Sequence, residues 1–278
     1  MRTKSLWDDE TYLKLIYRFS IDKKLNLENP ETFTEKIQWL KLNDRNPQYT
    51  NLVDKVKVKD YVEKKIGKEY IIPTIAVYDK AEDIDFNSLP DKFVMKCNHD
   101  SGTPFICKNK ADLDSNKVRK QFKKLLERDY YLALREWPYK NVERKIIVEE
   151  FITPPDIRDL RDYKFFCFNG EPKFFKIDFG RFSDHHSNYY DLNWNLLQYE
   201  EHPYPRDPLH KEEKPKNFDL MVSIAKKLSE GFSFIRVDLY NIKGKIYFGE
   251  LTLYPGSGFI PWKKTNHDSE IGKLLHLS

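Results

Sequence analysis

Two hairpin signals in the C-terminal half of the chain constrain its fold most strongly. The apolar runs 163–168 and 173–177 flank Asn169-Gly170, a pair typical of two-residue turns, although the Glu-Pro that follows would lengthen the loop. The runs 234–239 and 245–253 flank the turn sequence Asn241-Ile242-Lys243-Gly244. Because a short turn joins strands antiparallel, this half is expected to be built mostly from hairpins.

The N-terminal part of the chain is expected to be helical. Thr32-Phe33-Thr34-Glu35 has the spacing of a capping box, just before an apolar run, and a second helix is predicted over 54–66, ending at Gly67. Strands are predicted at 70–78, 93–97, 105–108 and 145–152, helices at 115–135 and 218–228, and a long surface loop at 183–216. This mixture indicates the α+β class, with a helical N-terminal segment (1–69) and two sheet-bearing lobes (70–152 and 153–278).

Composition argues against several classes of protein. Of 278 residues, 40% are hydrophobic, and the net charge of +4 is spread over interleaved acidic and basic residues, which does not indicate nucleic-acid binding. The three cysteines show no CxxC spacing, so neither disulfides nor zinc are expected. No apolar stretch reaches the length of a membrane span or a signal peptide, and we expect a cytoplasmic protein.

The last hairpin carries the residues most suggestive of chemistry. Side chains alternate along a strand, so Arg236 and Asp238 share one face, as do Glu250 and Thr252. Antiparallel pairing can bring Asp238 next to Glu250, giving two hard oxygen ligands of the kind that Mg²⁺ prefers. Arg236 beside them would clamp phosphate. The alternative is a solvated face with a structural ion pair.

Other stretches allow both a functional and an ordinary interpretation. Glycines in 254–258 would let backbone N–H groups approach an anion, or simply end a strand. Lys96, in an apolar run, needs an anion if buried, and the small-residue turn 98–103 after it could close over phosphates; otherwise Lys96 lies on an edge strand with its amino group in water. Lys164 has the same ambiguity. The run 147–152 suits adenine binding by backbone groups, or is only a buried strand.

The order of these motifs is more specific than any one of them. Asp54-Lys55, the strand lysine with its turn, Val-Glu-Glu-Phe, Arg-x-Asp and Glu-x-Thr-x-x-Pro-Gly together resemble the ATP-grasp superfamily. The stretches 26–47, 162–170 and 250–258 resemble its TupA-like branch, which is associated with teichuronopeptide biosynthesis. The resemblance extends over residues 25–265.

The resemblance implies an ATP-grasp fold with the nucleotide held between two lobes, and it implies a set of site residues. Lys55 and Lys96 would contact phosphates beneath a loop containing Ser101 and Gly102, Glu149 would face the adenine, Glu150, Phe151 and Ile152 would line its edge, and Lys164 would lie along the nucleotide. Asp238, Glu250 and Thr252 would hold Mg²⁺, Arg236 would stabilise the transferring phosphoryl group, and Gly256, Ser257, Gly258 and Arg181 would bind the acceptor. Arg158, Arg161, Arg181 and His185 would suit an acidic substrate or are only surface charge, and either Asp156 or Asp162 would bind the ribose. Thr252 departs from the asparagine that many superfamily members have there.

The implied activity is that of an ATP-dependent carboxylate–amine ligase working through an acyl-phosphate. A small-molecule or glycan carboxylate and an amine would be the substrates, with a uronic acid of a capsule or other cell-surface polysaccharide as the expected acceptor. Two alternatives stay open: a glycosyltransferase of polysaccharide synthesis, and a nucleotide-binding partner without catalytic activity.

Overall fold

The computed structural model describes residues 7–154, 156–157, 160–180 and 184–277. The chain forms two compact units, which are described separately below. Unit 1 is Asn46–Pro154, and unit 2 contains the described residues before Asn46 and after Pro154. These units cut the chain differently from the expected segments 1–69, 70–152 and 153–278, because the helices before Asn46 group with the C-terminal part of the chain.

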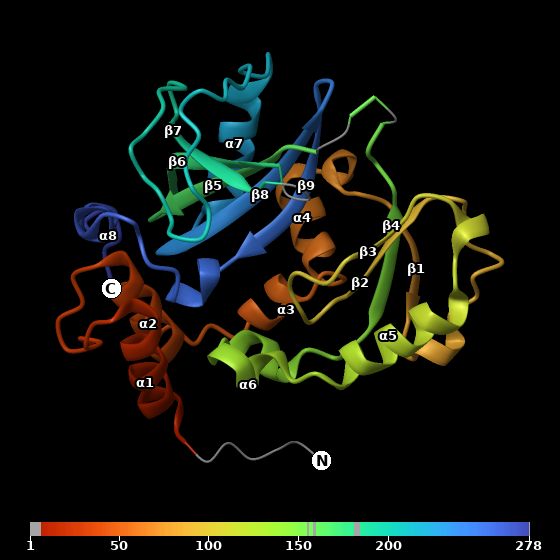
Figure 1. Ribbon diagram of the computed structural model, residues 1–278, viewed down its shortest axis with the longest axis horizontal. Coiled ribbons are helices and arrows are strands. Elements are labelled where there is room, and N and C mark those ends of the chain that lie inside the picture. The colour runs from red at the N-terminus through yellow and green to blue at the C-terminus, as the bar shows by residue number, and fades with distance from the viewer. Residues whose placement is uncertain (1–6, 155, 158–159, 181–183, 278) are drawn as a thin grey trace. The chain divides into compact units, whose positions relative to one another are not determined.

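Unit 1 contains a four-stranded antiparallel sheet in the order β1-β4-β2-β3 (Figure 1). Its strands are β1 (Thr74–Tyr78), β2 (Phe93–Cys97), β3 (Phe105–Cys107) and β4 (Ile146–Glu150). The amphipathic helix α5 (Ser115–Glu127) runs along one face and packs Val118, Phe122 and Leu125 into the core of this sheet. Its other helices are α3 (Tyr49–Val53), α4 (Val58–Ile66) and α6 (Tyr130–Leu134), with short 3₁₀ turns at Lys68–Tyr70, Ala81–Asp83, Lys110–Asp112 and Trp137–Asn141.

Three boundaries predicted for unit 1 are wrong, each for a local reason. The predicted strand 70–78 starts at Thr74, because a 3₁₀ turn ends at Tyr70 and Pro73 has no N–H to donate. The helix predicted from residue 54 starts at Val58, since the Asp54 carboxylate accepts the N–H of Val56 and holds a turn. The predicted helix 115–135 is two helices, because Arg128 has extended backbone angles and interrupts it.

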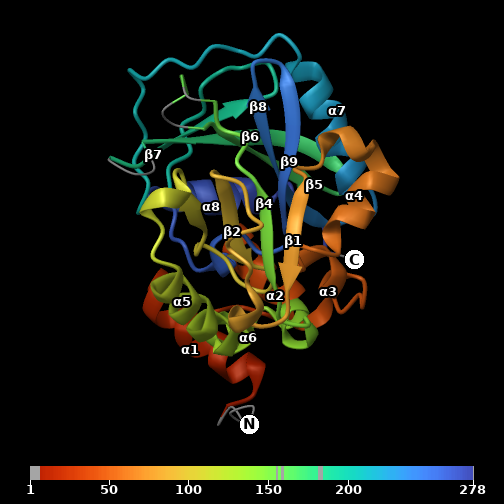
Figure 2. The same cartoon turned by 90° about the vertical axis from the view of Figure 1, so that its right-hand side faces the viewer.

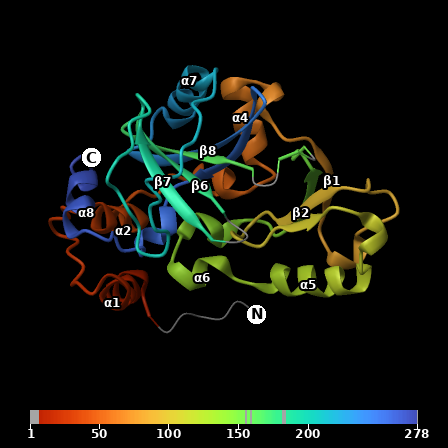
Figure 3. The same ribbon diagram turned by 45° about the horizontal axis from the view of Figure 1, so that its top comes forward.

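Unit 2 contains a five-stranded antiparallel sheet in the order β7-β6-β5-β8-β9. Its strands are β5 (Asp162–Phe168), β6 (Glu171–Phe179), β7 (His186–Asp191), β8 (Phe234–Ile242) and β9 (Lys245–Thr252), the last two forming a long hairpin (Figure 2). Helix α7 (Phe218–Ser229) covers one face (Figure 3), where Phe218 packs against Phe165 and Phe175 with ring centroids 5.9 and 5.0 Å apart. The opposite face carries the charged residues of the last hairpin.

The hairpin predictions for this sheet are confirmed, and one loop prediction is wrong. Asn169 and Gly170 form a two-residue turn with φ of 50° and 78°, and the Pro172 that was expected to lengthen the loop lies within β6 at a bulge. The predicted loop 183–216 contains strand β7. Polar residues around Tyr189 and Tyr190 hid its alternation, although both rings are buried against the sheet.

The N-terminal helices of unit 2 are α1 (Asp9–Ile21) and α2 (Phe33–Asn43), and α8 (Thr265–Gly272) lies beside α2 (Figure 1). The capping box is confirmed, because Glu35 N–H donates to Thr32 Oγ1 and Thr32 N–H donates to the Glu35 carboxylate. Asp268 of α8 also accepts from the backbone N–H of Thr34 at 2.9 Å and from its hydroxyl at 2.6 Å. A 3₁₀ turn covers Pro255–Gly258. Within the described residues, no helix combines the length and the apolar character that crossing a bilayer requires.

Candidate functional site

The β8–β9 hairpin brings four polar side chains onto one face of the unit 2 sheet. Asp238 is directly opposite Glu250, and Arg236 is directly opposite Thr252. Directly opposed residues of antiparallel strands have Cβ atoms about 5 Å apart on the same face. The expected placement of Asp238 opposite Glu250, on one face of the sheet, is therefore present in the structure.

Arg236 and Asp238 form a bidentate ion pair. Its Nε donates to Asp238 Oδ1 and its Nη2 to Oδ2, both at 2.7 Å, and Nη2 also donates to Thr252 Oγ1 at 2.9 Å. The side chains of the pair are only 12% and 5% exposed. Burial alone would lower the pKa of Arg236, but the Asp238 and Glu250 carboxylates outweigh it and raise the pKa, so the guanidinium stays charged.

The neighbouring strands continue this polar face with alternating charges. Lys164 of β5 lies opposite Asp238, and its amino group binds Asp162 and, at 2.9 Å, Asp178. Lys176 of β6 lies next to Lys164 and binds Glu201 at 2.8 Å. Each buried cation here has at least one carboxylate, which is the condition for keeping charges in an interior.

The two acids proposed for the ribose lie in different settings. Asp162 is buried at the start of β5 and bound to Lys164. Asp156 pairs with Lys243 at 2.7 Å on the surface, where both side chains are more than half exposed. The buried position of Asp162 favours it over Asp156 for a directional bond to a hydroxyl group, because water competes less there.

The donor set on the hairpin suits Mg²⁺. Among the described residues there is no group of three or more His, Cys, Asp or Glu side chains placed to hold a metal, so Asp238 and Glu250 stand as a pair. Mg²⁺ is usually bound by one or two carboxylates together with substrate phosphates and waters. Thr252 Oγ1 accepts a hydrogen bond from Arg236, and as a neutral hydroxyl it is a weaker metal ligand than the two carboxylates.

In unit 1 the buried carboxylate of Glu149 binds two lysines. Glu149 Oε2 is 2.6 Å from Nζ of Lys96, and Oε1 is 2.6 Å from Nζ of Lys59, a helix α4 residue that the sequence did not single out. Burial works to raise the pKa of Glu149, but the Lys96 and Lys59 ammonium groups outweigh it, so its pKa lies below the ordinary value. Lys96 is thus a partly buried lysine with an anion, and the edge-strand alternative is wrong because β2 lies between β4 and β3.

The segment after β2 is fixed at its start and exposed at its tip. Asn98, His99 and Asp100 are buried, whereas Ser101 and Gly102 are exposed. The Asn98 side chain donates to Asp54 Oδ1 at 2.9 Å and accepts from Lys145 N–H at 2.7 Å, which ties the segment to neighbouring elements. Any closing movement of the predicted lid 98–103 is therefore confined to its second half.

Lys55 lies beside this segment. Its backbone N–H donates to the Asn98 carbonyl at 3.2 Å, and its amino group donates to the Asp100 carbonyl. These contacts place the two lysines expected at the phosphates, Lys55 and Lys96, on neighbouring parts of unit 1, because Lys96 directly precedes the same segment.

Gly256, Ser257 and Gly258 form a strained turn held by helix α2. All three have positive φ (53°, 54° and 66°), which is unusual for a serine. Lys41 of α2, fully buried, donates to the Ser257 carbonyl at 2.6 Å and to its hydroxyl at 2.7 Å, and Gln38 donates to the Ser257 and Gly258 carbonyls at 3.0 and 2.9 Å. Through these hydrogen bonds, Lys41 and Gln38 of α2 fix the conformation of the 256–258 turn. Lys41 was missed although Leu40 and Leu42 flank it, because the sequence does not show what packs against this part of the helix.

The remaining predicted substrate residues are partly placed. Arg181 and Arg158 lie outside the described residues. Arg161 is paired with Glu212, and the ring of His185 lies 3.8 Å from Asp178 at the edge of the charged face. Each of these two side chains therefore already has an acidic neighbour.

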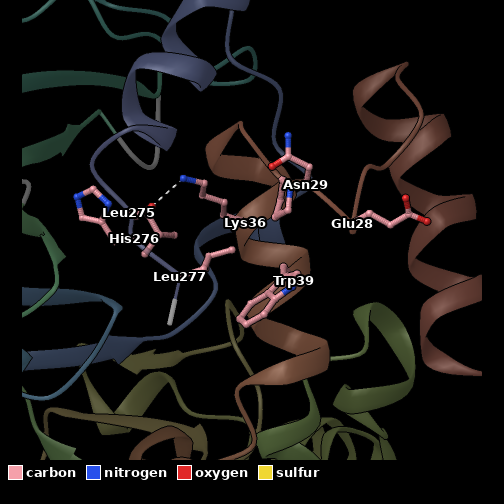
Figure 4. Close-up of a pocket in the computed structure, with 8 residues that line it drawn as sticks. Glu28, Asn29, Lys36, Trp39, Leu275, His276 and Leu277 are labelled. Atoms are coloured by element: carbon pink, nitrogen blue, oxygen red, sulfur yellow. Dashed lines mark hydrogen bonds between the residues drawn. The ribbon is translucent and has the colours of Figure 1, made fainter.

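A shallow pocket of about 350 Å³ lies elsewhere in unit 2 (Figure 4). It is lined by the loop before α2, by α2 itself and by the C-terminal tail, including Glu28, Trp39 and Leu277. Lys36 on its wall donates to the carbonyls of Gly272 and Leu275 at 2.8 and 2.7 Å, so its amino group ties the end of α8 to α2. None of the predicted site residues lines this pocket, and it carries no functional assignment.

Comparison with known proteins gives one family and several remote structural neighbours. The family model described as TupA-like ATP-grasp matches residues 35–276. The chain matches no curated protein. A D-alanine–D-alanine ligase from Bacillus anthracis, complexed with ATP, is 14% identical with a TM-score of 0.43; the match covers 73% of this chain and 53% of that one. The Helicobacter pylori D-alanine–D-alanine ligase is 13% identical with a TM-score of 0.46, over 88% and 69%. The ATP-grasp ligase PsnB, complexed with a precursor variant, Mg and ADP, is 10% identical with a TM-score of 0.42, over 79% and 57%.

Proposed function

The chain belongs to the TupA-like ATP-grasp family, and from this premise we propose that it is an ATP-dependent carboxylate–amine ligase that uses ATP and Mg²⁺. The family match confirms the predicted ATP-grasp class of the α+β fold. The observation that carries the proposal is the buried cluster of the last hairpin, in which Arg236 binds an Asp238 that pairs across the strands with Glu250. The chain spans about half the length of the first structural neighbour, so the activity of the whole protein is part of the proposal.

Unit 1 would bind the nucleotide base and part of the phosphate chain. The N–H of Glu150 already donates to the Pro73 carbonyl at 3.1 Å, so Glu150 would offer its own carbonyl to the adenine amino group, and Ile152 its N–H to a ring nitrogen. Phe151 would contribute an apolar wall. Lys96 and Lys55 would bind phosphate oxygens, with the exposed Ser101 and Gly102 closing over them.

Unit 2 would supply the charge compensation for the reaction. Asp238 and Glu250 would hold Mg²⁺, which when bound offsets the negative charge of the phosphates. Arg236, charged and fixed by three hydrogen bonds, would donate to the transferring phosphoryl group with little reorganisation. Lys164, opposite Asp238, would contact the nucleotide from the neighbouring strand.

The chemistry requires no protein nucleophile. A carboxylate oxygen of the acceptor attacks the γ-phosphorus, the bond to the β-phosphate oxygen breaks, and ADP leaves. An amine then attacks the acyl carbon, phosphate departs with the electron pair of the C–O bond, and the amine loses a proton to give the amide. The protein contributes position, charge and exclusion of water from the acyl-phosphate.

The acceptor would be a carboxylate of the cell envelope. The resemblance of residues 26–47, 162–170 and 250–258 to the TupA-like branch, which is associated with teichuronopeptide biosynthesis, supports a uronic acid of a surface polysaccharide as the carboxylate, and an amino acid or other amine as its partner. The turn 256–258, held rigid by Lys41 and Gln38 and adjacent in the chain to the metal pair, is the proposed acceptor-binding element, together with Arg181.

A product screen tests this function. The protein is incubated with Mg²⁺, ATP and mixtures of uronic acids and amines, and ADP is measured. ADP formation that needs both an acid and an amine is the expected result. Release of UDP from a sugar nucleotide would instead favour a glycosyltransferase, and ATP binding without any ADP formation would favour a binding partner without catalysis.

A further inference from the structure

Lys59 has no role in the scheme above, yet its amino group is fully engaged. It donates to the Ile72 carbonyl at 2.8 Å and to Thr74 Oγ1 at 2.7 Å, and it binds Glu149 Oε1 at 2.6 Å. An ammonium group has three N–H donors, so these acceptors use all of them. The side chain is 15% exposed. Lys59 would therefore have to give up one of these partners before it could bind a phosphate.

Lys96 is held more loosely. In the part of the chain that the structure describes, Glu149 Oε2 at 2.6 Å is the one hydrogen-bonding or ion-pair partner of its amino group. Two of its three N–H donors are thus left for another acceptor, and its side chain is 21% exposed. Lys96 can turn toward a ligand at the loss of a single ion pair.

The two lysines and Glu149 form an arrangement with one surplus positive charge. If Lys96 moves to a phosphate, Glu149 keeps Lys59 as its counterion and remains ionised in a buried position. Without Lys59, Lys96 would be the sole cation bound to Glu149. The cost of leaving a buried carboxylate unpaired would then hold Lys96 in place.

We propose that Lys59 is a positioning residue that keeps Glu149 compensated, so that Lys96 is free to exchange Glu149 for a nucleotide phosphate. This inference rests on the proposed nucleotide-binding function and adds a residue that acts through Glu149. Lys59 itself does not touch the nucleotide. Burial lowers the pKa of Lys59 and the Glu149 carboxylate opposes this shift, so Glu149 favours the charged form of Lys59.

The test is a double-mutant cycle read by calorimetric titration of ADP in the presence of Mg²⁺. Lys59→Met is expected to weaken ADP binding at least tenfold in the otherwise unchanged protein. In a Glu149→Gln background, where no carboxylate retains Lys96, the same change is expected to alter affinity less than threefold. Lys64→Met, an exposed lysine of the same helix, is the matched control and should leave affinity unchanged.

A pH series separates this role from a purely structural one. Among the residues that the structure describes, Lys59 and Lys96 are the charged groups that face Glu149, so in Lys59→Met the pKa of Glu149 should rise. Protonation of Glu149 then releases Lys96, and the affinity deficit of Lys59→Met relative to wild type should shrink as the pH falls from about 8 to about 5.5. If Lys59→Met folds poorly, Lys59→Gln, which keeps a neutral hydrogen-bond donor at this position, replaces it in the cycle.

Two results would overturn the inference. Equal losses of affinity in both backgrounds would mean that Lys59 acts on the nucleotide directly, and an unchanged affinity of Lys59→Met would mean that Glu149 does not retain Lys96. Failure of the wild-type protein itself to bind ADP with Mg²⁺ would overturn the proposed function, and the inference with it.

Discussion

The buried pair of Arg236 and Asp238 permits a quantitative prediction from the structure. Arg236→Met removes two charge-assisted hydrogen bonds of 2.7 Å and leaves a carboxylate that is only 5% exposed. Breaking a buried pair from one side typically costs about 3–5 kcal/mol. Lys164 lies opposite Asp238 on the next strand and compensates part of the charge, so we expect the lower end, about 3 kcal/mol.

The double variant Arg236→Met/Asp238→Asn also removes the charge of the buried Asp238 carboxylate, which Arg236→Met leaves without its ion-pair partner. It should recover most of the loss and lie within about 1 kcal/mol of wild type, because an amide is cheaper to bury than an unpaired carboxylate. Urea unfolding without divalent cations measures both variants, followed by tryptophan fluorescence, to which Trp39, Trp194 and Trp262 of unit 2 contribute. Lys226→Met breaks the exposed pair with Glu171 and is the control, with an expected loss below about 1 kcal/mol. A double variant no more stable than Arg236→Met would refute the reasoning.

Three further predictions concern activity, pH and the acceptor turn. Asp238→Asn and Glu250→Gln should each abolish ADP formation while near-ultraviolet circular dichroism stays native, and wild-type rates from both would contradict the metal assignment. The pKa of Glu149 is lower in the folded protein than in the unfolded chain. Its ion pairs therefore stabilise the protein at pH values above the unfolded-state pKa, and this stabilisation is lost as the pH falls through the folded-state pKa. The difference in unfolding free energy between wild type and Glu149→Gln, measured in urea, should shrink between pH 7 and about pH 3.5. Lys41→Met removes both hydrogen bonds to Ser257, and should raise the KM for the carboxylate at least tenfold while ADP affinity measured by titration stays unchanged.

Local sequence signals predicted the parts of the fold that depend on short-range chemistry. The capping box at Thr32, the turn at Asn169-Gly170 and the helix stop at Gly67 each need only neighbouring residues, and each is found in the structure. The break after α5 and the strand β7 depend on tertiary packing, which can override an amphipathic pattern or hide an alternating one.

The candidate site was predictable only as far as the hairpin that carries it. The turn at Lys243-Gly244 by itself would set Asp238 opposite Gly249, and the bulge between Asp238 and Leu239, which could not be read from the sequence, brings it opposite Glu250. Lys59 is different, because it belongs to a charged helix and meets Glu149 of β4 only through the packing of α4. No spacing rule connects residues so far apart in the chain.

The central claim is that Asp238 and Glu250 jointly hold the Mg²⁺ that accompanies the nucleotide. Its most direct test is calorimetric titration of ADP with and without Mg²⁺, on wild type and on Asp238→Asn/Glu250→Gln. We predict that Mg²⁺ strengthens ADP binding at least tenfold in wild type and has no effect on the double variant. An equal strengthening by Mg²⁺ in both proteins would contradict the claim.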